Sequence, residues 1–186
     1  MKRFAVGLVA MTTAVLAALW LVTRPAPAPS APVPTHLTAD GVPDFAAYPV
    51  AAPERYRLND EFPTQGFRTS TGFVCVTLQH RAMFALDCQG PFAGAPGGAN
   101  HVHLFSYGPG NASLPIQFSH NDQVVSDFYD VDQDHLPVLP AGEVYGEGNT
   151  ACVHTDEILL ACRISDPVKG NGFIATATTT TTFGQR

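Results

Sequence analysis

Charged residues are scarce in this 186-residue chain, at 14% of the sequence, whereas ordinary globular proteins carry about 25%. Helical periodicity is lacking too, because no apolar repeat of helical period is sustained for about three turns after residue 24. These absences argue against a coiled coil or a long-helix protein. The formal net charge of −6 makes nucleic acids and anionic lipids poor partners.

Known catalytic signatures are absent as well. The chain has no G-x-S-x-G or S-x-x-K motif for a nucleophilic serine. It also lacks the H-E-x-x-H zinc motif, the P-loop and a glycine-rich nucleotide motif after a strand. The sequence therefore favours a non-catalytic binding or interaction module over an enzyme.

The N-terminus has the features of an export signal. Lys2 and Arg3 precede residues 4–23, which are uncharged and mostly apolar. Residues 1–24 are predicted to form an apolar helix, and a run of this length could span a bilayer. It is either a signal anchor that keeps the protein at the membrane or a signal peptide that is removed on secretion. Both alternatives place the rest of the chain outside the cell membrane.

Residues 25–65 are predicted to be a proline-rich linker and an extended arm. Five prolines between residues 24 and 34 favour polyproline II over a packed structure. The aromatic residues Phe45, Tyr48 and Tyr56 are expected to hold the arm against the domain that follows.

Residues 66–183 are predicted to form a β domain, followed by a short tail at 184–186. Short strand-like segments alternate with Gly- and Pro-rich turns. This pattern predicts a mostly β fold, either an antiparallel β-sandwich or a partly closed barrel. The expected strands are 72–78, 82–88, 101–107, 115–119, 123–131, 150–154, 158–164 and 172–182.

The four cysteines predict two local disulfides, Cys75–Cys88 and Cys152–Cys162, because each pair brackets a short segment with hairpin character. Zinc binding by the four cysteines is disfavoured, since zinc ligand pairs are usually separated by only about two to four residues.

Two constellations could bind metal, although the preferred prediction includes no cofactor. His101 and His103 lie two residues apart on an expected strand, so both imidazoles share one face. With a third ligand from His120, His135 or His154, or from one of the aspartates, the pair could bind zinc or copper in a metal-binding protein or a metal-dependent enzyme.

The second constellation is acidic. Asp130, Asp132 and Asp134 occupy positions 1, 3 and 5 of a calcium-loop pattern, although the glycine and the final glutamate of that pattern are missing. A calcium-stabilised surface module is therefore another alternative.

A set of turn residues, aromatics and cysteines carries a family resemblance. It comprises Pro43-Asp44-Phe45 with Tyr48, Gly66-Phe67-Arg68-Thr69 with Gly72, the stretch from Cys88 to Asn100, Leu139-Pro140-Ala141-Gly142, and Gly172-Phe173. Over roughly residues 42–183, the chain resembles a group of exported or membrane-anchored proteins of mycobacteria and related actinobacteria. The group has no assigned activity, so the resemblance implies a bacterial cell-envelope protein with an envelope component as partner and supplies no catalytic residue.

Overall fold

The computed structural model describes residues 31–59, 64–107, 114–120, 132–147, 149–164 and 170–184. The apolar helix predicted for residues 1–24 lies outside these ranges. None of the described residues belongs to a helix long and apolar enough to cross a membrane.

The described residues form short strands and 3₁₀ helices. The strands are β1 (Arg57–Asn59), β2 (Thr64–Arg68), β3 (Val74–His80), β4 (Met83–Gln89), β5 (His101–Tyr107), β6 (Gln117–Ser119), β7 (Val144–Glu147), β8 (Thr150–Val153), β9 (Leu160–Ile164), β10 (Asn171–Ala175) and β11 (Thr180–Phe183). The 3₁₀ helices are η1 (Phe45–Ala47), η2 (Pro53–Tyr56), η3 (Pro96–Gly98) and η4 (Gln133–His135).

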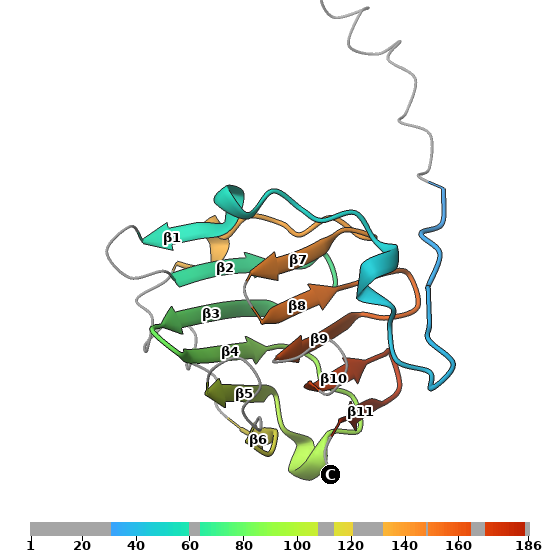
Figure 1. Ribbon diagram of the computed structural model, residues 1–186. Coiled ribbons are helices and arrows are strands. Elements are labelled where there is room, and N and C mark those ends of the chain that lie inside the picture. Colours follow the sequence, from blue (N-terminus) through green and yellow to red (C-terminus); the bar gives the residue numbers. More distant parts are fainter. Residues whose placement is uncertain are drawn as a thin grey trace, which may run out of the picture. The chain divides into compact units, whose positions relative to one another are not determined.

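The strands form two antiparallel sheets in which neighbours along the chain are neighbours in space (Figure 1). One sheet has the order β1-β2-β3-β4-β5-β6, and the other has the order β11-β10-β9-β8-β7. The prediction of a mostly β, disulfide-containing fold is confirmed. Across the described residues the two sheets stay separate, so they do not form a closed barrel.

Both sheets contribute to one hydrophobic core. In β4 and β5 the side chains alternate, so that Leu86, Cys88 and Val102 point into the core. From the second sheet, Cys162 and Phe173 join the same cluster. The inner faces of the two sheets therefore pack against each other.

Each sheet contains one disulfide between directly opposed residues. Cys75 faces Cys88 across β3 and β4, and Cys152 faces Cys162 across β8 and β9. Both predicted disulfides are present, and all four cysteines are fully buried. Each disulfide joins the two strands of one hairpin. The short separation of the cysteines in the sequence was therefore sufficient to predict the pairing.

The arm before β1 packs against the five-stranded sheet. Phe45 and Tyr48 belong to a second hydrophobic cluster with Val153 and other residues on the outer face of that sheet. The Arg163 guanidinium lies 4.8 Å from the centre of the Phe45 ring. As expected from the sequence, these aromatic residues hold the arm against the domain.

Three strands arise where none was expected. β1 and the start of β2 come from the segment assigned to the arm, and β7 lies between the expected strands 123–131 and 150–154. The single strand expected over 172–182 is divided into β10 and β11 by a turn. The strand expected over 123–131 lies outside the described residues.

Candidate functional site

The candidate site is a cluster of polar side chains on the outer face of the six-stranded sheet. Asp87 lies between the core residues Leu86 and Cys88, so its side chain points away from the core. By the same alternation, His101 and His103 flank the core residue Val102 in β5. Strand register then sets Asp87 directly opposite His103 and sets Ser119 of β6 opposite His101.

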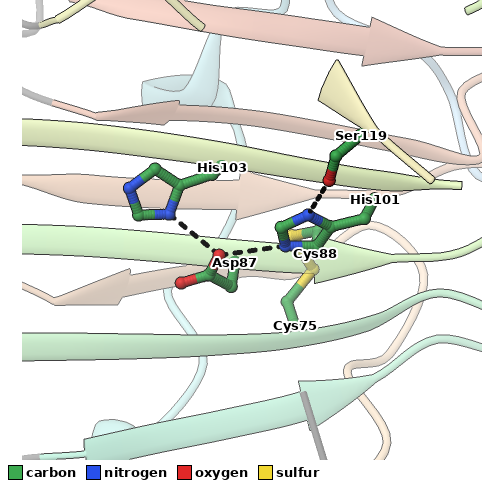
Figure 2. Close-up of polar contacts among 6 residues, drawn as sticks. All are labelled: Cys75, Asp87, Cys88, His101, His103 and Ser119. Atoms are coloured by element: carbon green, nitrogen blue, oxygen red, sulfur yellow. Dashed lines mark hydrogen bonds and ion pairs between the residues drawn. A yellow bond between two sulfur atoms is a disulfide. The ribbon is translucent and has the colours of Figure 1, made fainter. Parts of the chain in front are cut away.

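Hydrogen bonds connect these four residues in a continuous chain (Figure 2). Asp87 Oδ1 lies 3.0 Å from His101 Nε2 and 2.8 Å from His103 Nδ1. The other ring nitrogen of His101, Nδ1, lies 2.8 Å from the Ser119 Oγ. A single oxygen of the Asp87 carboxylate is therefore hydrogen-bonded to both imidazoles. The His101 imidazole also connects this carboxylate to Ser119.

Burial differs along this chain of hydrogen bonds. Asp87 and His101 are each only 5% exposed, whereas the His103 side chain is 31% exposed and Ser119 is exposed. The hydrogen bond that the His103 ring donates to the Asp87 carboxylate raises the pKa of His103 above its usual value, and burial partly opposes this effect. A buried carboxylate therefore stabilises the protonated form of the partly exposed imidazole.

A row of rings continues from the polar cluster along β5. The His103 ring stacks on Phe105 at a centroid distance of 5.9 Å, and Phe105 meets Tyr107 edge-to-face at 4.7 Å. Tyr107 ends the row and is 53% exposed. The polar cluster thus borders an accessible aromatic surface.

In the fold, both histidines of the predicted pair contact Asp87, which was not named as a candidate from the sequence. Asp87 is within 3.0 Å of both imidazoles. Even so, within the described ranges only Cys75, Cys88 and Cys162 have three ligand atoms that all lie within 4.8 Å of one another. All three are in disulfides and offer no thiolate. A metal held by Asp87, His101 and His103 together would therefore require the two imidazoles to move closer to each other.

The other histidines considered as third ligands make different contacts. His154 is buried, with its Nε2 2.8 Å from the carbonyl oxygen of Leu139. His120 lies near the carbonyl oxygen of Gly98, and the His135 Nδ1 is 2.6 Å from a carboxylate oxygen of Asp132.

The acidic stretch is described only in part, because Asp130 lies outside the described residues. Asp132 caps η4, accepting a hydrogen bond from the backbone N–H of Asp134. Its other oxygen bonds to His135, and this bond lowers the pKa of Asp132. Both aspartates are exposed. The calcium hypothesis stays a prediction.

No protein-family model, curated protein or solved structure matches this chain. The resemblance to the actinobacterial group therefore stays a prediction too.

Two members of the cluster, Asp87 and Ser119, were missed in the sequence. Asp87 interrupts an otherwise apolar strand, and this was the one signal that could have singled it out. Ser119 carries no such signal, because it reaches His101 only through the pairing of β5 with β6.

Proposed function

We propose that this chain is an exported cell-envelope protein whose β domain is an interaction module, and that the outer face of the six-stranded sheet contacts its partner. The row of His103, Phe105 and Tyr107 is the observation that carries the interaction role. Aromatic side chains are enriched at protein interfaces, and a tyrosine adds a hydroxyl group to its apolar ring. The partner would be a component of the cell envelope.

Export is supported by two separate features. The apolar run after Lys2 and Arg3 is typical of an export signal. Disulfides persist in oxidising compartments and are rare in a reducing cytosol, and this chain has two. The domain is either held at the membrane by residues 4–23 or released by cleavage.

The compartment can be tested by fusing residues 1–31 to an alkaline phosphatase that is active only after export. We expect activity from this fusion and none from a fusion that begins at residue 25. N-terminal sequencing of the mature full-length protein then distinguishes the anchor from the cleaved signal. A full-length protein found in the cytosol with four reduced cysteines would contradict export.

The interaction role can be tested by crosslinking the full-length protein in envelope extracts and comparing two variants. Tyr107→Ser removes the exposed end of the ring row, whereas Val50→Ser changes a residue of the arm that is 68% exposed. We expect Tyr107→Ser to lose a crosslinked envelope component that Val50→Ser retains. Equal crosslinking by both variants would exclude this face as the contact surface.

A further inference from the structure

Ser119, His101 and Asp87 lie in the order nucleophile, base and orienting carboxylate. The Ser119 Oγ is 2.8 Å from His101 Nδ1, and His101 Nε2 is 3.0 Å from Asp87 Oδ1. The first distance is within the range for a nucleophile that gives its proton to a base, and the second is a hydrogen bond that can orient the base. Such arrangements are recognised by their geometry, because they occur on unrelated folds with different chain orders.

The hydrogen-bond roles follow from the chemistry of the carboxylate. An ionised Asp87 can only accept, so His101 must donate the Nε2 proton to it. In the neutral imidazole, Nδ1 then has a free lone pair and accepts the hydroxyl proton of Ser119. The two ring nitrogens have the reverse of their roles in the serine-protease triad, but the serine still faces the basic nitrogen.

An activated nucleophile must be exposed to its substrate, whereas the groups that activate it can be buried. Asp87 and His101 are almost completely buried, so bulk water has little access to the bond between them. Ser119 is exposed on β6, which is an edge strand of the six-stranded sheet in the described part of the chain. His103 also bonds to Asp87 Oδ1 and helps to fix the carboxylate. Ser119 is therefore an exposed residue, while the groups that would activate it are buried and held in place.

We propose that Ser119 is an activated nucleophile that accepts the acyl group of a carboxylic ester. The Ser119 Oγ forms a bond to the carbonyl carbon, and its proton moves to His101 Nδ1. The bond from that carbon to the alcohol oxygen then breaks, and the alcohol leaves with the proton from Nδ1. Water releases the acyl group by the same steps, and Ser119 regains its proton.

A neutral ester is the class of substrate that the charges favour. The chain carries a formal net charge of −6, and the Asp87 carboxylate lies behind His101. A phosphate monoester would bring additional negative charge toward these groups and would be repelled.

This inference goes beyond the proposed interaction role, because the module could bind its partner without any reaction at Ser119. The full-length protein is treated with a fluorophosphonate probe, in which the serine oxygen displaces fluoride at phosphorus and the serine proton moves to His101. Mass spectrometry then locates the label. Ser70 is exposed in the turn between β2 and β3 and serves as an internal control.

General-base activation predicts labelling of Ser119 at least about 100-fold faster than labelling of Ser70. Ser119→Ala should abolish the fast labelling, and Ser70→Ala should leave it unchanged. Both positions are exposed, so neither change removes a core contact. Labelling of Ser119 at the rate of Ser70 would overturn the proposal.

A second experiment measures the acyl transfer itself with p-nitrophenyl acetate. The wild-type protein should gain one acetyl group on Ser119 and release p-nitrophenolate, whereas Ser119→Ala should gain none there. Release of p-nitrophenolate at the same rate from both proteins would also overturn the proposal.

Discussion

The sulfur of Cys162 lies within 4.8 Å of the sulfur of Cys75, although the two residues belong to different sheets and are bonded to other cysteines. The two disulfides therefore lie close together in the core. This proximity has a chemical consequence, because disulfides exchange when a thiolate reaches a neighbouring disulfide sulfur.

Replacing Cys152 with Ser should cause disulfide exchange. The variant leaves the Cys162 thiol beside the Cys75–Cys88 bond, and attack there produces a bond from Cys162 to Cys75 or to Cys88. Peptide mapping after thiol trapping should detect these new bridges, with Cys152→Ser/Cys162→Ser as a control that cannot form them. A variant that keeps only the Cys75–Cys88 bridge after prolonged incubation at pH 8 would contradict this prediction.

Replacing both cysteines of either disulfide should destabilise the domain. The bridges close loops with sequence separations of 13 and 10 residues. In the chain-entropy model, each contributes about 3 kcal/mol by restricting the unfolded chain. Urea unfolding of Cys75→Ala/Cys88→Ala and of Cys152→Ala/Cys162→Ala measures the loss. Unfolding of both variants at the wild-type midpoint would contradict this stabilising role of the disulfides.

The hydrogen bond between His103 and Asp87 should make stability depend on pH. The pKa of His103 is higher in the folded protein than its ordinary value of 6.5. The folded state therefore binds the proton more tightly, and its stabilising effect is complete below that ordinary pKa. As the pH rises through the folded pKa, this contribution to the free energy of unfolding is lost.

Replacing His103 with Gln should flatten the pH dependence of unfolding above the ordinary histidine pKa of 6.5. His135→Gln is a suitable control, because this imidazole is also paired with an aspartate but both side chains are exposed to solvent screening. Urea unfolding at several pH values measures the effect. An unchanged profile in His103→Gln would show that another group controls this range.

Gly172 in β10 should not tolerate a side chain, because β9 and β11 pack closely on either side of it. A Cβ at this position would lie 2.3 Å from the Cys162 carbonyl oxygen and 2.2 Å from the Phe183 ring. Gly172→Ala should therefore reduce the free energy of unfolding by about 1–3 kcal/mol, the usual range for an overpacked core.

Gly146→Ala in β7 is a matched control for the change at Gly172, because a Cβ there meets no heavy atom within 4 Å. The same urea experiment compares the two variants. Equal stability of both alanine variants would contradict the close packing of β9, β10 and β11.

Protein purified without chelator or nickel affinity should contain less than one equivalent of zinc. The ligand atoms of Asp87, His101 and His103 do not all come within 4.8 Å of one another. Elemental analysis measures the metal content. Stoichiometric zinc that disappears in His101→Gln but persists in His120→Gln would instead establish a zinc site at the histidine pair.

Local sequence patterns predicted much of the fold. β3, β4 and β5 were expected close to their observed positions, because each is long enough to show strand composition between turn residues. β2 and β7 were missed, since they are short and each contains a glycine. The run of 172–182 contains none of the usual turn residues (Gly, Pro, Asn, Asp or Ser) after its first residue, Gly172.

The chain nevertheless turns within that run, because the side chain of a threonine forms hydrogen bonds with the backbone of the turn. The Thr176 hydroxyl accepts from the backbone N–H of Thr179 and donates to the Thr179 carbonyl oxygen. A hydroxyl that bonds to its own nearby backbone can form a turn, so strand propensity alone was misleading here.

The sequence by itself determined the two disulfides, the mostly β class and the aromatic residues that hold the arm, because these depend on residues near one another in the chain. Only the tertiary structure decided that Asp87 and Ser119 would join His101, since strand register places them together. It likewise decided that Cys162 would approach Cys75, because the packing of two sheets brings their inner faces into contact. Register depends on the hydrophobic pattern of each strand together with the loops that join the strands, so no single segment shows which residues will meet.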